Sequence, residues 1–155
     1  MRKQQKGFSL IELLIVVAII LIIAAIAIPN LLRAKIAANE ASAVGSIRTL
    51  NTASVAFSTA YNAYPTGIAQ LGPVATGTAP SSSTADLIDQ TLALGLKSGY
   101  SFSWGAGAAG AGLSYTITAV PQNVGVTGQR YFFSDQSGVI RVNLSSVATA
   151  GDLPL

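Results

Sequence analysis

The chain begins with an almost unbroken apolar run. Residues 8–28 read FSLIELLIVVAIILIIAAIAI, and only Ser9 and Glu12 in this run are polar. At 1.5 Å per residue the run forms a helix of about 31 Å, close to the ~30 Å hydrocarbon core of a bilayer. A helix that packs on a globular core carries a polar stripe, and this one carries none after Glu12. The pattern therefore predicts a transmembrane helix over residues 8–28.

Beyond Pro29 the pattern stays helical but becomes amphipathic, over residues 29–64. Apolar side chains recur three, four or seven residues apart and define one stripe. Pro29 cannot donate a hydrogen bond to the Ala25 carbonyl, so we expect a kink or a loosened turn there. Pro65 predicts the end of the helix. The stripe comprises Leu32, Ile36, Val44, Ile47, Leu50, Phe57, Tyr61 and Tyr64, and the charged residues off it are Arg33, Lys35, Glu40 and Arg48.

Residues 65–98 are expected to form a variable loop with one short helix. Gly, Pro, Ser, Thr and Ala dominate residues 65–83, as is typical of a loop. Ser83, followed three residues later by Asp86, resembles a helix N-cap, and apolar residues four apart come after it. The pattern predicts a short helix over residues 85–96.

The remainder of the chain, residues 99–155, predicts an antiparallel sheet. Apolar and small polar residues alternate, and Asp135-Gln136-Ser137-Gly138 is typical of a hairpin turn. We expect residues 105–112, rich in Gly and Ala, to form a long hairpin loop. The fold class is therefore α+β, with the second half of the long helix packed on a four-stranded antiparallel sheet. The predicted strands are residues 100–104, 113–119, 130–134 and 139–143.

Composition excludes several kinds of catalytic site. The chain has no Cys and no His, which removes disulfides, the common zinc sites, Cys–His dyads and Ser–His–Asp triads. We therefore expect no enzyme activity, no catalytic residue, no cofactor and no metal. Nine Lys and Arg residues against six Asp and Glu residues give a net charge of +3.

The whole of that net charge lies in the first seven residues, on Arg2, Lys3 and Lys6. From residue 8 onward the chain is formally neutral and has no run of basic residues interleaved with aromatics, so nucleic-acid binding is not expected. The basic start keeps the N-terminus cytoplasmic and sends the C-terminal part outward.

Three explanations of the N-terminal segment compete. An ordinary signal peptide would be cut at the small-x-small site Ala25-Ile26-Ala27 and would leave a secreted binding domain. A plain single-pass anchor would leave the chain attached to the membrane. Both leave Glu12 without a role, although a carboxylate at the bilayer centre costs about 2.5–3.5 kcal/mol.

The third explanation accounts for more residues. The string Lys6-Gly7-Phe8-Ser9-Leu10-Ile11-Glu12 resembles the prepilin cleavage motif of type IV pilins and type II secretion pseudopilins. The matching parts are a basic leader, residues 1–7, that ends in Gly7, then Phe8, Glu12 at the fifth place after the break, the apolar span and Pro29. The chain most resembles a bacterial type IV major pilin, and the resemblance implies the pilin fold.

The resemblance also implies a course of processing and assembly. A prepilin peptidase would cut between Gly7 and Phe8 and methylate the new amine of Phe8. Glu12 would then pair with the terminal amine of a neighbouring subunit, as an assembly ATPase and an inner-membrane platform move copies from membrane lipid into a helical homo-oligomer. The precursor would cross the bacterial inner membrane once, with its C-terminal domain in the periplasm, and would end in an extracellular pilus. A pseudopilin that forms a short periplasmic filament is the alternative within the family.

An ion pair between Glu12 and the amine is physically reasonable. An α-amino group with a pKa near ~7.7–8 is mostly charged at neutral pH, and it needs a counter-ion away from water. Glu12 is the only acid in the apolar span. Because burial of the pair costs desolvation, we expect it to set subunit register more than to add stability.

Two weaker motifs are set aside. Residues 105–110 fit the glycine pattern of a dinucleotide site, but a strand pattern follows them where that site needs a helix. Asp135 could suggest calcium, but calcium takes six to eight oxygen ligands and this region offers one carboxylate.

Overall fold

A computed structural model describes residues 8–155. One helix, α1, runs from Leu10 to Tyr61 and is continuous through Pro29. It starts two residues later and ends three residues earlier than the sequence pattern predicts. Asn62 ends it, because this residue takes a left-handed conformation (φ 57°) that a helix cannot continue. The chain divides into two compact units between Lys35 and Ile36.

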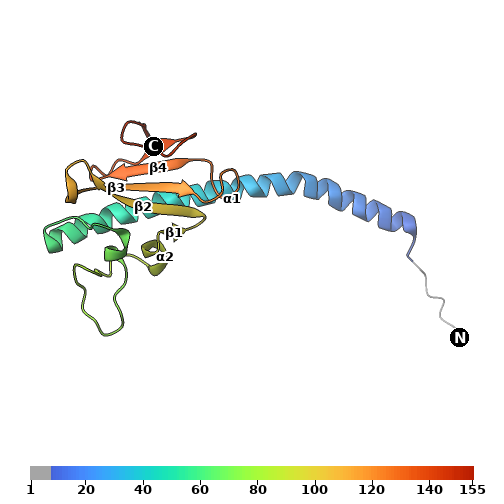
Figure 1. Cartoon of the computed structure of the whole chain (residues 1–155). Helices are drawn as coiled ribbons and strands as arrows, with labels where there is room; N and C mark the ends of the chain where they lie inside the picture. Colours follow the sequence, from blue (N-terminus) through green and yellow to red (C-terminus); the bar gives the residue numbers. More distant parts are fainter. Residues whose placement is uncertain (1–7) are drawn as a thin grey trace. The chain divides into compact units, whose positions relative to one another are not determined.

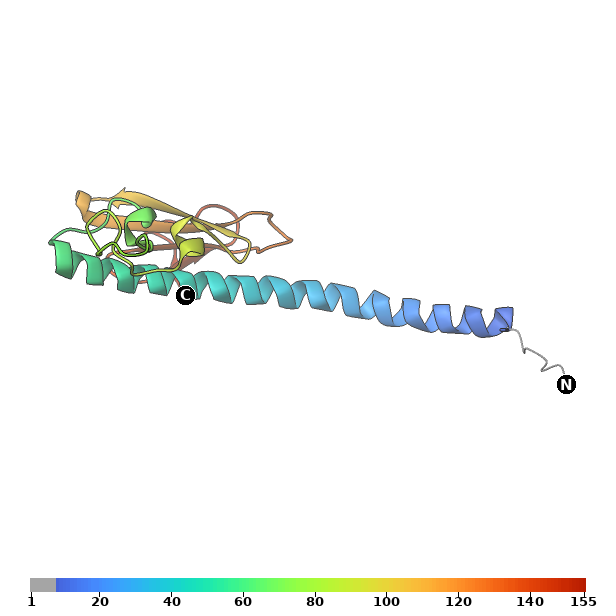
Figure 2. The same cartoon turned by 90° about the horizontal axis from the view of Figure 1, so that it is seen from below.

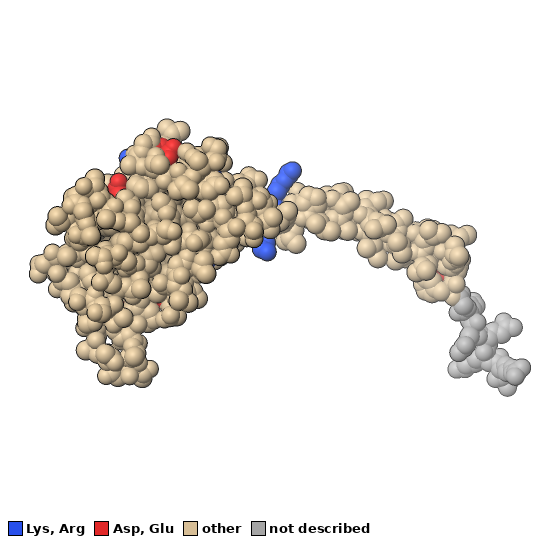
Figure 3. All heavy atoms as spheres, viewed as in Figure 1, with Lys and Arg blue, Asp and Glu red and all other residues tan. Residues whose placement is uncertain are grey.

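In the first unit, the described residues 8–35 bury no side chain. α1 is the one helix within the described residues that is long and apolar enough to cross a membrane, and its most apolar 18-residue window has a mean hydropathy of 3.3. Almost all of this segment is tan in the space-filling view, because it carries hardly any charge (Figure 3). The exposed apolar surface is the arrangement that a lipid environment requires and that water penalises.

The second unit, Ile36–Leu155, contains an antiparallel sheet with the strand order β1-β2-β3-β4-β5-β6. The second half of α1 lies along one face of this sheet (Figures 1 and 2). The sheet has six strands where the sequence predicts four, since two-residue edge strands leave no periodic pattern. The strands are β1 Leu96–Lys97, β2 Tyr100–Gly107, β3 Gly110–Pro121, β4 Tyr131–Asp135, β5 Arg141–Asn143 and β6 Leu153–Pro154.

The core lies between α1 and the inner face of the sheet. Ile47 and Leu50 on the helix are fully buried, as are Tyr100, Ile117 and Phe132 on the strands. The ring of Trp104 stacks on Tyr115, with centroids 4.9 Å apart. The apolar stripe of residues 36–57 is therefore the packing face of α1, as its spacing predicts, although Leu32 is exposed.

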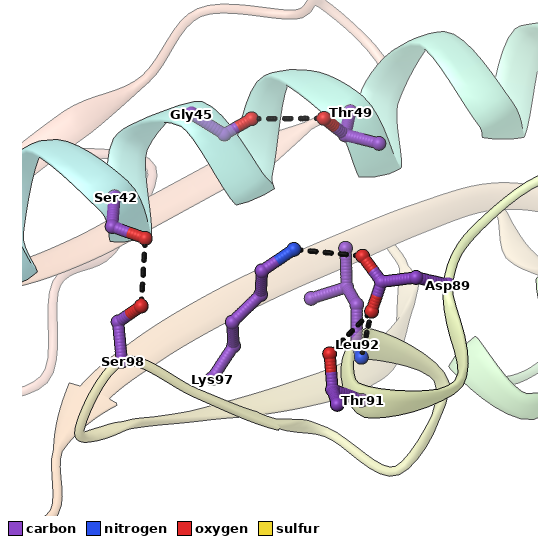
Figure 4. Close-up of polar contacts among 8 residues, drawn as sticks. All are labelled: Ser42, Gly45, Thr49, Asp89, Thr91, Leu92, Lys97 and Ser98. Carbon is purple, nitrogen blue, oxygen red and sulfur yellow. Dashed lines mark hydrogen bonds and ion pairs between the residues drawn. The ribbon is translucent and has the colours of Figure 1, made fainter.

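The predicted helix over residues 85–96 is wrong. Only α2, Gln90–Ala93, is helical there, and its N-cap is Asp89, whose carboxylate accepts from the Leu92 amide at 2.8 Å. Asp86 has φ 56°, and its own amide donates to the Gly72 carbonyl. The amides on either side of it donate to carbonyls of the Ile68–Leu71 turn, η1. These bonds hold the segment against the turn, so it cannot form the helix that the Ser83 capping pattern predicts. Asp89 also pairs with Lys97 at 2.7 Å (Figure 4).

Two hairpins differ from the expected loops. The Gly-Ala stretch is not a long loop. β2 ends at Gly107 and β3 begins at Gly110, so only two residues form the turn between them. Ser98 and Gly99, both left-handed, join β1 to β2, which matches the type I′ turn that suits a two-residue hairpin. The turn predicted after Asp135 is confirmed, since its carboxylate accepts from the Ser137 amide at 2.9 Å.

Glu40 is a buried part of the second unit, although the stripe places it among the solvent-facing charges. Its Oε2 accepts from Arg130 Nε at 2.7 Å, and Oε1 accepts from the backbone amides of Gln129 and Arg130 at 2.9 and 3.2 Å. Burial raises the pKa of Glu40, but these hydrogen bonds outweigh it and hold the pKa below its ordinary value. The carboxylate ties α1 to the segment that precedes β4.

Gly128 lies in that segment, and its replacement should be costly. A Cβ on Gly128 would stand 2.6 Å from Cζ of Tyr100, whose ring is fully buried and whose hydroxyl donates to the Arg130 carbonyl at 2.9 Å. Because the ring cannot move away, we expect Gly128→Ala to lower the free energy of unfolding by about 1–3 kcal/mol. Denaturant unfolding of the full chain in detergent, followed by Trp104 fluorescence, measures this.

The matched control is Gly45→Ala, because a Cβ there meets no atom within 4 Å. Gly45 is in a helix, so its replacement should stabilise the chain by roughly 0.4–1 kcal/mol. Equal stabilities of the two variants would show that Tyr100 yields to the added methyl group.

Candidate functional site

The segment from Phe8 to Glu12 forms the entrance to α1. Phe8 precedes the helix and is 80% exposed. Ser9 is the residue before the first helical position, Leu10, and its carbonyl accepts from the Leu13 amide at 3.2 Å. Glu12 lies in the first turn, and its Oε2 accepts from the Ser9 amide at 2.9 Å. The carboxylate therefore closes its own helix start.

This contact is one half of a capping box, in which a glutamate at the third helical position accepts from the amide before the helix. A negative charge in the first turn is also favoured by the helix dipole. The cleavage-motif resemblance implies a partner for Glu12 on another subunit and does not predict its bond to Ser9. The Ser-x-x-Glu spacing of Ser9 and Glu12 is the signal that could have revealed it.

Among residues 8–155, which the structure describes, Glu12 has no cationic partner. It is the only acid in residues 8–35, and Arg33, the first described cation after it, comes 21 residues later. The side chain is exposed. Its one hydrogen bond within the described part of the chain is an exposed bond to a neutral amide, which a positively charged group could replace. The carboxyl group is therefore accessible to a group outside its own helix.

The structure does not bring the other predicted residues to this point. Pro29 is 17 residues beyond Glu12, about 26 Å further along the helix, so the two act separately. Gly7, Arg2, Lys3 and Lys6 lie outside the described residues. The proposed cleavage point is thus described on its Phe8 side.

The ionisable side chains in the rest of the described chain are few and scattered. Within residues 8–155, no group of three acidic side chains could hold a metal ion. A hollow of about 380 Å³ on the second unit is lined by one cation and by small or apolar groups, with no acid to work with it. The glycines of the dinucleotide-like pattern lie in the β2–β3 hairpin. The lining residues of the hollow are Arg48, Thr49, Thr52, Ala53, Ala56 and Leu87.

Taken together, these features define an α+β protein whose apolar N-terminal helix begins with an exposed aromatic residue and a capping glutamate. Residues 2–28 match the family model of the prokaryotic N-terminal methylation motif. The chain is similar to the type IV wide pilus major component PilA4 of Thermus thermophilus, with 63% identity over 38 residues that cover 24% of this chain and 29% of that protein.

The chain is also similar to the type IV major pilin protein PilA of Myxococcus xanthus, with 46% identity over 54 residues. This match covers 35% of the chain and 24% of that protein. In both cases the matched stretch spans less than a third of the relative's length. The matches confirm the resemblance to type IV pilins that the cleavage motif indicates.

Proposed function

We propose that this chain is the precursor of a structural subunit that polymerises into a type IV pilus. The observation that carries the proposal is the apolar segment of α1, which has a mean hydropathy of 3.3 over 18 residues, none of them buried. Such a surface needs lipid or other copies of itself. The methylation motif over residues 2–28 and the two pilin relatives support other copies of the chain as the final cover of this surface.

The proposed course begins in the membrane. Arg2, Lys3 and Lys6 orient the precursor with its N-terminus in the cytoplasm and its second unit in the periplasm. A prepilin peptidase cuts after Gly7 and methylates the amine of Phe8. The apolar helix then moves from lipid into the filament, where its surface stays covered, under the action of the assembly platform and ATPase. The role is structural, not catalytic.

Glu12 guides docking in this proposal. Cleavage creates a charged amine on Phe8, four residues before Glu12. Away from water such an amine requires an anion. Glu12 is exposed, and from residue 8 onward its only hydrogen bond is to the Ser9 amide. The amine of a neighbouring subunit can replace that amide, so each docking event exchanges a local cap for an ion pair.

A pseudopilin of a type II secretion system remains the alternative within the family. It would carry the same motif and would form a short periplasmic filament. Both named relatives are pilus components, which favours the pilus. Shearing the cells and imaging the released fraction separates long surface filaments from short periplasmic ones.

The mature N-terminus provides the direct test. We expect mass spectrometry of the protein from its native membrane to show a chain that starts at N-methylated Phe8. A chain that starts at Ile28 would identify an ordinary signal peptide, and an uncut chain would identify a plain anchor. Either result would remove the prepilin assignment. Gly7→Leu, which blocks cleavage by bulk at the cut, should accumulate uncut precursor in the same membranes.

A further inference from the structure

The first cations after the apolar segment have no anionic partner on their own helix. Arg33 and Lys35 end a run of uncharged residues that begins after Glu12. Both side chains are exposed, and neither takes part in the two salt bridges found among the described residues. No acid stands three or four residues away from either one on α1. The blue side chains that follow the tan segment in Figure 3 mark this change.

The spacing of Arg33 and Lys35 places their side chains on two opposite sides of the helix. Two residues correspond to a rotation of about 200° at 3.6 residues per turn, so Arg33 and Lys35 point to opposite sides of α1. A protein partner at one side would meet one of them. A planar layer of anions through which the helix passes would meet both, and we infer a membrane surface on this basis.

Their height along the helix agrees with a membrane surface. With Phe8 at one edge of the hydrocarbon core, Arg33 and Lys35 lie about 38–41 Å along the axis. A bilayer is about 30 Å thick in its hydrocarbon core and about 40–45 Å with its headgroups. Measured from the same edge, the opposite headgroup layer ends at about 35–38 Å. The backbone of both cations therefore lies at the outer margin of that layer, from which their long side chains can extend back to the phosphates.

We propose that Arg33 and Lys35 bind the phosphate groups of acidic phospholipids at the surface where the apolar helix leaves the membrane. The proposal rests on the membrane stage of the proposed function. Once the leader is cut off, these are the only cationic side chains beside the span, and the next residues, Ile36 to Ala38, carry no charge that could stop the helix from sinking. The two cations thus set the depth at which the mature subunit waits.

Retention of lipid by the purified protein tests the proposal. The parent protein for this assay is the full chain with Arg2, Lys3 and Lys6 each replaced by Gln, so that the leader contributes no cationic side chain. It is purified in neutral detergent, mixed with phosphatidylglycerol and phosphatidylcholine, and examined by native mass spectrometry. We expect preferential retention of phosphatidylglycerol, and we expect the added changes Arg33→Gln and Lys35→Gln to weaken that retention by about tenfold or more, since each cation near an anionic surface strengthens binding by about fivefold.

Three controls keep the result specific. Arg48→Gln removes a cation further along α1 and should leave lipid retention unchanged. Arg33→Lys with Lys35→Arg keeps both charges and should bind as the parent does. Inorganic phosphate at the concentration of the lipid should not displace it, since displacement would identify a site for free phosphate.

Equal retention of phosphatidylglycerol by the parent and by the double variant would overturn the proposal. Salt-sensitive self-association in neutral detergent would also overturn it if the double variant loses that self-association. The two cations would then bind a second copy of the chain and not lipid. The assay needs no assembly machinery, so it is separate from the pilus assignment. If the cells make filaments but the purified protein retains no acidic lipid, only the proposed lipid site is contradicted. If the protein retains acidic lipid but the cells make no filaments, only the proposed pilus function is contradicted.

Discussion

Replacing Glu12 by Gln should leave cleavage after Gly7 intact and reduce surface filaments by roughly thirtyfold or more. The amide oxygen of Gln can still accept from the Ser9 amide, as Glu12 Oε2 does at 2.9 Å, so the helix start keeps its cap. What the variant lacks is the negative charge for the neighbour's amine. Loss of one partner of a buried charge pair costs about 2–5 kcal/mol, which accounts for that reduction. Mature subunit in membranes is measured by mass spectrometry, and filaments are counted by electron microscopy of the sheared fraction.

Comparison of Glu12→Gln with Glu12→Ala separates the role of the charge from that of the helix cap. The Ala variant removes both, so it should assemble no better than Glu12→Gln. If the Gln variant makes normal numbers of filaments and the Ala variant does not, Glu12 acts through its bond to Ser9 and the counter-ion role is wrong. Glu40→Asp is not a suitable control, because Glu40 is buried. The exposed Asp86→Asn change removes one carboxylate elsewhere and should leave assembly unaffected.

Replacing the other glutamate, Glu40, should instead destabilise the second unit. Glu40→Gln loses the ion pair to Arg130 and places an amide nitrogen or a weaker acceptor opposite the two backbone amides. Breaking a buried pair costs about 3–5 kcal/mol. Because Arg130 is 38% exposed and can be rehydrated, we expect the lower end, about 3 kcal/mol. Denaturant unfolding of the full chain in detergent, read by Trp104 fluorescence, measures the change.

The pH dependence identifies the charge as the cause. Since the folded-state pKa of Glu40 lies below its ordinary value of 4.5, the stability that its charge contributes is complete above that value and is lost as the pH falls through the folded-state pKa. The difference between wild type and Glu40→Gln should therefore be largest at pH 7 and shrink below about pH 4.5. A difference that stays constant down to pH 3 would assign the effect to packing.

The chain provides its own controls for this variant. Glu12→Gln is the same chemical change outside the second unit and should not alter the unfolding of that unit. Lys97→Gln breaks the other salt bridge, whose side chains are 35% and 51% exposed, and should cost less than about 1 kcal/mol. A comparable loss in both ion-pair variants would mean that burial of Glu40 adds nothing.

Much of the fold could be predicted because its long elements carry strong periodic signals. The apolar run and the stripe from Ile36 to Phe57 define one helix, and alternation defines the central strands. The short elements could not be predicted in this way. A two-residue strand such as β1 or β6 has no period, and it exists because a neighbouring strand offers free backbone groups. The false helix over residues 85–96 has the same origin, since tertiary hydrogen bonds to η1 and Gly72 override a local capping pattern.

The candidate site shows a similar division. Phe8, Glu12 and Pro29 stand out by type and position, because an acid and a proline are conspicuous in an apolar helix. The roles of Ser9, Arg33 and Glu40 depend on what surrounds them in three dimensions. Glu40 in particular lies among charges that face water by spacing alone, and only the approach of Arg130, 90 residues later, turns it into a buried anion.

The two edges of the sheet bear on how closely these molecules can be crowded. The edge strands β1 and β6 have two residues each, and Pro154 removes an amide from one of them. Long free edges let sheets of separate molecules join by backbone hydrogen bonds, and short or proline-containing edges prevent it. In the membrane and filament stages that we propose, such edges would protect crowded copies against fusing into amyloid-like ribbons and would leave their association to side chains.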